Sequence, residues 1–238
     1  MKLRNRLSNP AVARSISVRV VTLALSLSLV TAGSIPANAL DICDVDPKSV
    51  VCITGKASSI SVVVNKIRPL IPNNYHPSNL VRIPKYNPLG RFAKKEVSDA
   101  IVKLGNRMMA AGKGTLVVQS GFRSYSAQIK MHSYKVSAHG KSIGERLAAR
   151  PGYSEHQTGL AVDFGPPTST SRIWLAANAY KFGFILRYPS GKTKITGYNY
   201  EPWHFRYVGL ETSTAMHDQG IKTLEEFYSL PAAPGYLN

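Results

Sequence analysis

Two short segments of this chain hold a group of side chains that restricts both its fold and its chemistry. They are residues 154–164 (SEHQTGLAVDF) and residues 201–205 (EPWHF). Two imidazoles and one carboxylate could bind a metal, and a further carboxylate stands beside the last imidazole. The candidate ligands are His156, Asp163 and His204, and the further carboxylate is Glu201. Three protein ligands, an open fourth position and a nearby general base are the minimal equipment of a hydrolytic zinc enzyme.

The first segment has the alternation of a β-strand. Leu160, Val162 and Phe164 are large and apolar, and they alternate with Ala161 and Asp163. Because a strand turns successive side chains to opposite faces, the apolar residues face the core and Asp163 faces away from it. A carboxylate in that position needs a cation, a cap or a salt bridge as a partner. The spacing differs from the i, i+4 histidine pair of HExxH proteases, so it leaves these alternatives open.

The second segment begins another strand. Trp203, Phe205 and Tyr207 alternate with His204 and Arg206, which puts His204 on the polar face of that strand. The candidate zinc site is therefore expected at the face of a sheet.

The rest of the pattern adds helices and short strands. Apolar residues at three- and four-residue steps predict a helix from Arg91 to Ala111. Further helices are predicted at residues 124–137 with Ser124 as the N-cap, at 171–181, and at 216–228 with an interruption at Gly220. Further strands are predicted at residues 115–119 and 184–187. This mixture favours a compact α+β domain with a small, mainly antiparallel sheet and flanking helices.

The first 39 residues are typical of a secretory signal peptide. A basic region is followed by an apolar run at residues 20–30 and by the small-x-small cleavage pattern Ala37-Asn38-Ala39. The run is shorter than the roughly 20 residues that cross a bilayer, so cleavage is predicted and a retained anchor is the alternative. The mature protein is then expected to be secreted, without a stable membrane span.

Residues 40–88 are predicted to form an extended N-terminal arm. Five prolines between residues 66 and 88 disfavour regular helices there. The two cysteines, Cys43 and Cys52, lie just past the predicted cleavage site, and export favours a disulfide between them. No other cysteine or histidine lies nearby in the sequence to complete a zinc site with this pair. The predicted catalytic domain is residues 89–238.

The chain is strongly basic. Its formal net charge is +17, and removal of the five basic residues of the signal peptide leaves +12. Such an excess suits an anionic setting such as a cell wall, a membrane surface or nucleic acid, and solubility alone explains it equally well. A nucleic-acid partner is not predicted, because the chain has no recognisable recognition motif and carries an export signal.

Three blocks of sequence resemble a known family. They are SGFRSYSAQ at residues 120–128, PGYSEHQTGLAVDF at 151–164 and EPWHFRYVG at 201–209. In this order they are similar to the VanY-type D-alanyl-D-alanine carboxypeptidases of the M15 metallopeptidase family. The resemblance spans roughly residues 91–228, and the N-terminal arm lies outside its clear part.

The resemblance implies a zinc ion held by His156, Asp163 and His204, with water in the fourth position. It implies that Glu201 takes the proton of the zinc-bound water and delivers it to the departing amine. Glu201 and His204 would face opposite sides of a straight strand, so a bend at Pro202 is needed to bring both to one metal.

The resemblance also implies a substrate side to the site. Arg123 is expected either to stabilise the carbonyl oxygen as it becomes an oxyanion or to bind the carboxylate of the peptide. Gln128 and Ser154 match substrate-binding positions of the family. Read without the motif, they would be a solvated helix residue and a loop cap.

Rival functions are less well supported. The chain has neither the Ser-x-x-Lys and Lys-Thr-Gly motifs of serine penicillin-binding enzymes nor the Gly-x-Ser-x-Gly motif of α/β-hydrolases. A non-catalytic wall-binding protein with a structural zinc is a further alternative, although such sites are usually closed by a fourth protein ligand. We therefore expect a secreted zinc carboxypeptidase that hydrolyses the terminal D-alanyl-D-alanine bond of peptidoglycan stem peptides. L,D-carboxypeptidase and endopeptidase activities would use the same machinery.

Overall fold

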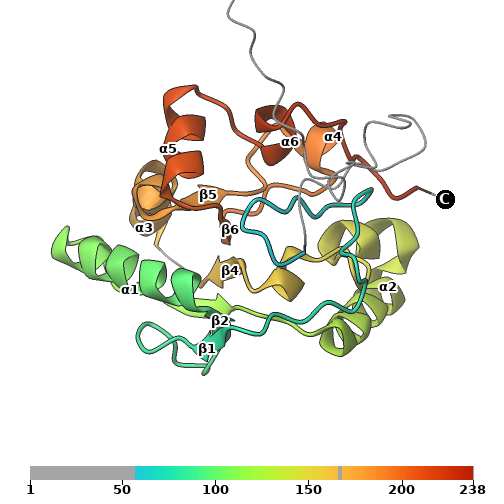
Figure 1. The fold of residues 1–238 in the computed structure, drawn as a ribbon, viewed down its shortest axis with the longest axis horizontal. Coiled ribbons are helices and arrows are strands. Elements are labelled where there is room, and N and C mark those ends of the chain that lie inside the picture. Colours follow the sequence, from blue (N-terminus) through green and yellow to red (C-terminus); the bar gives the residue numbers. More distant parts are fainter. Residues whose placement is uncertain (1–56, 166–167, 238) are drawn as a thin grey trace, which may run out of the picture. The chain divides into compact units, whose positions relative to one another are not determined.

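A four-stranded antiparallel sheet is the centre of the fold in the computed structural model, which describes residues 57–165 and 168–237 (Figure 1). The strands follow the order β3-β4-β6-β5, and every neighbouring pair is antiparallel. Their bounds are Val118–Ser120 for β3, Ala161–Phe164 for β4, Phe184–Leu186 for β5 and His204–Tyr207 for β6. The predicted α+β class with a small antiparallel sheet is confirmed.

The pairing of β4 with β6 sets the two faces of this sheet. Val162 lies opposite Phe205, and Asp163 lies opposite His204. Val162 and Phe205 are buried in the main core, so Asp163 and His204 share the other face, as the alternation in the sequence predicts. The core side is covered by apolar residues of helix α1, Lys95–Ala110.

The start of α1 differs from the prediction. Phe92–Lys94 forms strand β2, which pairs antiparallel with β1, Leu80–Arg82, and the helix begins only at Lys95. The apolar periodicity of residues 91–111 does not predict this pairing, because the partner strand lies in the proline-rich arm. The expected helical start at Arg91 was therefore four residues too early.

Helix α2 spans Tyr125–Leu147 and is interrupted at Gly140, whose φ of 75° and ψ of 160° are not helical. Ser124 caps it by accepting a hydrogen bond from the backbone N–H of Ala127, as predicted. The prediction ended this helix near Ser137, whereas helical residues resume after the kink. The second part packs against the first at Gly144, where a Cβ atom would stand 2.6 Å from Cα of Val136.

The remaining elements are short. They are the 3-10 helices η2 at Glu155–Thr158 and η3 at Ala179–Phe182, and the α-helices α3 at Ser169–Asn178, α4 at Thr193–Thr196, α5 at Leu210–Asp218 and α6 at Leu224–Phe227. The helix predicted at 171–181 thus ends three residues early and continues as η3. The one predicted at 216–228 consists of the end of α5 and of α6. In Figure 1, α1 and α2 lie at opposite ends of the sheet.

The described part of the N-terminal arm belongs to the main core. Val62, Val64, Leu70 and Ile83 are buried among the residues of α1 and the sheet. Residues 57–88 contain no helix, which agrees with their proline content. The predicted signal peptide and the predicted Cys43–Cys52 disulfide lie outside the described residues. Within the described part of the chain, no helix is both long and apolar enough to cross a membrane.

The close contact at Gly144 yields a stability prediction. In Gly144→Ala, the new Cβ atom would meet Cα of Val136 at 2.6 Å and the carbonyl oxygen of Lys135 at 2.8 Å, both of which are backbone. We expect a loss of about 1–3 kcal/mol from overpacking, larger than the gain of about 1 kcal/mol from helix propensity. Urea unfolding measures it. Gly235→Ala is the control, because nothing lies within 4 Å of its Cβ position. Equal stability of the two variants would contradict the predicted clash.

Candidate active site

His156 is held at the sheet by the short helix η2. Gly159, at a φ of 72°, ends η2 in the left-handed conformation and lets the chain turn directly into β4. The Nδ1 atom of His156 lies 2.8 Å from the carbonyl oxygen of Gly121, which follows β3. Because a carbonyl oxygen only accepts, Nδ1 carries the proton and donates, and Nε2 is left with its lone pair.

The other two predicted ligands meet His156 at the polar face of the sheet. Asp163 of β4 has Oδ2 3.4 Å from Nε2 of His156 and Oδ1 3.1 Å from Nδ1 of His204, the first residue of β6. One ligand atom from each of these three residues lies within 4.8 Å of the others. We call His156, Asp163 and His204 the ligand cluster.

Glu201 reaches the same place through a turn. The backbone N–H of His204 donates to the carbonyl oxygen of Glu201 at 3.1 Å, and Pro202 lies inside this turn. Glu201 Oε2 is 3.9 Å from His204 Nδ1, so both side chains point to one side, as the predicted bend requires. Trp203 precedes β6 and is half exposed, although the alternation had placed it inside the strand.

Burial and neighbouring charges shift the pKa values at this site. Burial raises the pKa of Glu201 to about 7, against the opposing effect of His204. Burial lowers the pKa of His204, but hydrogen bonds to Asp163 and Glu155 outweigh it and raise this pKa to about 9. Burial likewise disfavours the charged form of Asp163, yet His156 and His204 hold the pKa of Asp163 well below its usual range. The site therefore combines an ionised ligand with a carboxyl group that titrates near neutral pH.

Arg123 is fixed beside the ligand cluster. Its Nη1 donates to Oε1 of Gln128 at 3.0 Å, and its Nη2 donates to Oγ of Ser120 at 3.1 Å. Gln128 is fully buried, and its Nε2 donates to the carbonyl oxygen of Ala149 at 2.7 Å. Gln128 thus lies behind Arg123, with both ends of its amide engaged.

A cavity of about 350 Å³ opens over these groups. It is lined by the ligand cluster, Glu201 and Arg123, and also by Ser154, Lys135 and Tyr188. Ser154 makes no side-chain capping bond to η2, so its hydroxyl is not used as a loop cap. The ring of Tyr188 stacks on that of His204, with 4.8 Å between centroids. Trp203 and Asp163 line both this cavity and a second one of about 350 Å³.

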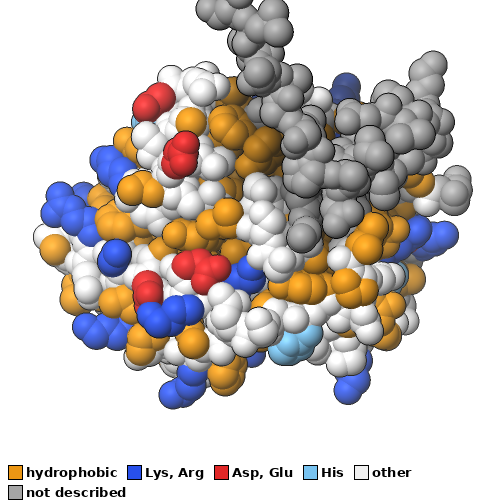
Figure 2. Space-filling model, viewed as in Figure 1, with side chains coloured by type: hydrophobic (Ala, Val, Ile, Leu, Met, Phe, Trp, Pro, Cys, Tyr) orange, Lys and Arg blue, Asp and Glu red, His pale blue; other side chains and the backbone are white. Residues whose placement is uncertain are grey.

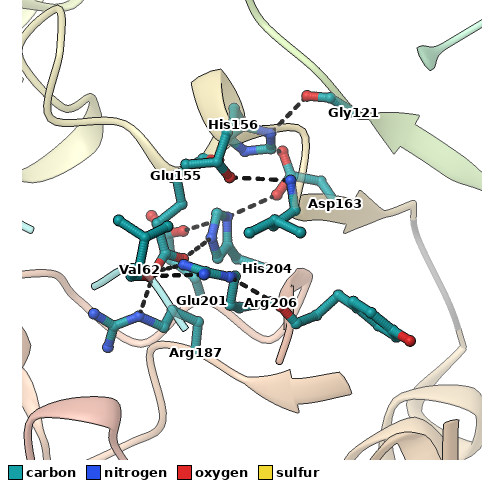
Figure 3. A network of polar contacts seen from close by, with 12 residues as sticks. Val62, Gly121, Glu155, His156, Asp163, Arg187, Glu201, His204 and Arg206 are labelled. Carbon is teal, nitrogen blue, oxygen red and sulfur yellow. Dashed lines mark hydrogen bonds and ion pairs between the residues drawn. The ribbon is translucent and has the colours of Figure 1, made fainter. Parts of the chain in front are cut away.

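A buried group of charged residues lies behind His204 (Figure 3). It consists of Glu155, Arg187, Arg206 and Glu225, and we call it the buried charge cluster. Each of its four ion-pairing side chains has a relative exposure of 0%. Glu155 directly precedes the candidate ligand His156, and the sequence alone would allow either solvent exposure or a place beside the metal; in the structure its side chain is fully buried. Of these four residues, strand alternation could place only Arg206, which follows His204 by two residues and therefore lies on the same face of the strand.

The ligand cluster suits a divalent ion of the zinc type. Two imidazoles and one carboxylate form a common three-ligand set for catalytic zinc, with one position left open. Each histidine also has an acceptor for its second ring nitrogen, namely the Gly121 carbonyl oxygen and the Glu155 carboxylate. Such partners fix the tautomer that a metal requires. The three predicted ligands therefore lie close together, and both histidines have a hydrogen-bond acceptor for the ring nitrogen that does not face the ligand cluster.

Comparison with known proteins identifies the family. A family model described as VanY, D-alanyl-D-alanine carboxypeptidase, matches residues 91–210. The chain belongs to this family. The resemblance seen in the sequence is thereby confirmed, and so is the prediction that the protein is an enzyme.

Individual relatives give the scale of the similarity. A D-alanyl-D-alanine carboxypeptidase of Enterococcus faecalis is 44% identical in an alignment 125 residues long, which covers 47% of this chain and 46% of that protein. The solved LD-carboxypeptidase LdcB is 37% identical with a TM-score of 0.66, covering 73% of this chain and 87% of LdcB. A vancomycin-resistance D,D-pentapeptidase, VanY, solved with Zn(II), is 35% identical with a TM-score of 0.63, covering 71% of this chain and 98% of that one.

The buried charge cluster yields a prediction for Glu225→Gln. Arg187 donates to both oxygens of Glu225 at 2.9 and 2.8 Å. Burial raises the pKa of Glu225, but Arg187 outweighs it and holds the pKa below its usual 4.5. A lowered folded-state pKa stabilises the protein above the unfolded pKa, and this stabilisation is lost as the pH falls through the folded pKa. We expect the variant to lose about 3–5 kcal/mol at pH 7, and the difference from wild type to shrink below about pH 4.5.

Urea unfolding of both proteins at pH 7 and at acidic pH measures this difference. Glu226→Gln is the matched control, because its ion pair with Lys192 is partly exposed and such pairs contribute about 1 kcal/mol or less. A pH-independent difference for Glu225→Gln would show that the ionised form of Glu225 is not what stabilises the fold.

Proposed function

We propose that the protein is a secreted, zinc-dependent carboxypeptidase that removes the terminal D-alanine from peptidoglycan stem peptides ending in D-alanyl-D-alanine. The observation that carries this proposal is a single cavity bordered by the ligand cluster, by Glu201 and by Arg123. Membership of the VanY family supports the substrate class, and the VanY relative solved with Zn(II) supports the metal.

Zinc would be held by Nε2 of His156, a carboxylate oxygen of Asp163 and Nδ1 of His204. When bound, it supplies Lewis acidity, which lowers the pKa of a coordinated water towards about 7 and polarises the scissile carbonyl group. Glu201 is not part of the three-residue ligand cluster found among residues 57–165 and 168–237. This favours an open catalytic position over the closed site of a non-catalytic wall-binding protein.

Glu201 is the proton carrier of the proposed reaction. Its carboxylate lies 3.9 Å from a ligand atom of His204, close enough to receive a proton from the attacking water. Its buried surroundings raise its pKa to about 7, so the same carboxyl group can hold that proton and deliver it to the departing amine near neutral pH.

Arg123 and Ser154 form the substrate side of the cavity. Arg123 donates hydrogen bonds to Gln128 and Ser120, and it forms no ion pair with a carboxylate within residues 57–165 and 168–237. We assign its free donors to the C-terminal carboxylate of the peptide, because a rigid guanidinium fork matches a carboxylate. Gln128 then acts by positioning Arg123, and Ser154 offers its hydroxyl to the peptide.

Cleavage one residue further along the peptide is the second candidate. The LdcB relative is an LD-carboxypeptidase of similar identity and greater TM-score than the VanY relative. The residues proposed to carry out the reaction would be the same for both bonds. The choice between D,D- and L,D-activity therefore depends on which residue the cavity accepts before the terminal D-alanine.

The proposed site of action is the cell wall outside the cytoplasm. The predicted N-terminal signal favours export, and the mature charge of +12 suits an anionic wall, whereas a recognisable nucleic-acid recognition motif is lacking. Figure 2 shows Lys and Arg side chains around the edge of the visible face and few Asp and Glu side chains.

Mass spectrometry of the products from defined muropeptides tests the function. We expect the zinc-loaded protein to release D-alanine from a pentapeptide ending in D-alanyl-D-alanine. Release from a tetrapeptide instead would assign the L,D-activity. Release of D-alanine from neither peptide would refute the carboxypeptidase proposal.

The matched control is Glu201→Ala. This variant should keep one zinc per chain, because the three ligands remain, and it should lose about 10²–10⁴-fold in kcat, which is the usual contribution of a general acid–base group. Loss of zinc together with activity would identify Glu201 as a structural ligand.

A second prediction concerns Arg123→Ala. If Arg123 binds the peptide carboxylate, the variant should raise KM for the acid about 10- to 100-fold, as expected for a lost hydrogen bond to a charged group. It should also lose the preference of the wild type for the free acid over the C-terminal amide. Lys135→Ala is the control, because Lys135 is a cation that lines the same cavity without bonding Gln128. An equal fall in kcat on acid and amide would assign Arg123 to the oxyanion instead.

A further inference from the structure

The buried charge cluster has an asymmetry that ion pairing alone does not explain. Arg187 Nε and Arg206 Nη1 both donate to the same oxygen of Glu155, Oε1, at 2.8 and 3.0 Å. The other oxygen, Oε2, faces Nε2 of His204 at 3.3 Å. A carboxylate serving only its arginines could place one oxygen on each guanidinium group. Here one oxygen takes both guanidinium groups and the other faces the imidazole (Figure 3).

This arrangement determines which nitrogen of His204 carries a proton in the metal-bound form. A carboxylate that accepts from two guanidinium groups is ionised and can only accept, so Nε2 of His204 must donate to it. The Nδ1 atom on the other side of the ring, 3.1 Å from Asp163, is then the atom that presents its lone pair to a metal.

The carboxylate of Glu155 cannot easily turn away from His204. Arg206 donates through Nη2 to the carbonyl oxygens of Ile60 and Val62, at 3.0 and 2.7 Å. Arg187 is fixed at its other end by two hydrogen bonds to Glu225. Four segments far apart in the sequence thus hold one carboxylate, and a fully satisfied buried network of this kind is rigid.

We propose that Glu155 is the positioning residue for the His204 ligand, and that Arg187 and Arg206 serve to hold it there. The proposal rests on the zinc site of the proposed function. It distinguishes the two histidines, because His156 is oriented by the backbone carbonyl of Gly121, which no side-chain substitution removes, whereas His204 depends on one side chain.

Glu155→Gln tests this role. The two guanidinium groups require an acceptor, so the amide oxygen of the glutamine should face them and its NH₂ group should face His204. Nε2 would then have to accept, which moves the proton to Nδ1, the atom needed by the metal. We expect the affinity for Zn²⁺ to fall about 10- to 100-fold, the usual cost of losing a residue that orients a ligand. We also expect the absorption spectrum of the Co²⁺-substituted protein to change.

Glu225→Gln is the matched comparison, and it should lose less Zn²⁺ affinity than Glu155→Gln, because its amide oxygen can still accept from Arg187. It removes the other carboxylate of the buried charge cluster, which bonds Arg187 and Asn65 but not His204. Zn²⁺ affinity is measured by competition with a chromophoric chelator, for the two variants and the wild type, under conditions where each is fully folded. Wild-type Zn²⁺ affinity in both variants would overturn the proposal, as would an equal loss in both.

Nitrogen NMR of the zinc-loaded wild type tests the same proposal if Glu155→Gln does not fold. We expect Nδ1 of His204 to show the shift of a metal-bound nitrogen and Nε2 to carry a slowly exchanging proton. Metal binding through Nε2 would overturn the proposal. A wild type that binds Zn²⁺ through His204 but releases no D-alanine would refute the proposed function alone. Zn²⁺ binding unchanged in His204→Ala would refute the metal site and, with it, this inference.

Discussion

The register of β4 against β6 is the constraint on which the rest of this structure depends. It pairs Asp163 with His204 on one face and Val162 with Phe205 on the other. A shift of one residue would turn the carboxylate or the imidazole into the core and the apolar partners outward. The burial of Val162 and Phe205 therefore selects the alignment that the ligand cluster needs, and core packing and site geometry are set by the same pairing.

The buried charge cluster lies on the enclosed side of this site. We attribute to it the orientation of His204 more than a gain in the stability of the fold. Replacing a buried ion pair by well-packed apolar residues is often neutral or stabilising, because desolvation offsets the Coulomb attraction. The cluster of Glu155, Arg187, Arg206 and Glu225 is balanced in charge and fully enclosed. In the part of the chain that the structure describes, its side chains contact the ligand cluster through Glu155 and His204, so the cluster acts on the orientation of this imidazole.

On the open side, the candidate substrate groups are tied to the wall of the cavity. Gln128 joins the guanidinium group of Arg123 to the carbonyl oxygen of Ala149, which also lines the cavity. The position of Arg123 and the shape of the cavity are therefore coupled through one amide. Relatives with similar identity act as D,D- and as LD-enzymes, which agrees with a fixed reacting centre and a specificity set by such walls.

The sequence by itself determined the face on which Asp163 and His204 lie and the need for a bend at Pro202, because strand alternation and proline geometry are local properties. It also singled out the candidate ligand residues. Its motifs also identified the family. Only the tertiary structure decided that Phe92–Lys94 is a strand, that α2 continues past Gly140 and that Glu155 is buried beside two arginines. Each of these features depends on a partner elsewhere in the chain. Strand β2 pairs with β1 in the arm, the second part of α2 packs on the first, and Glu155 bonds arginines that come just after β5 and in β6. Sequence periodicity predicts the face to which a side chain points, but it does not predict which residues of other segments that side chain contacts.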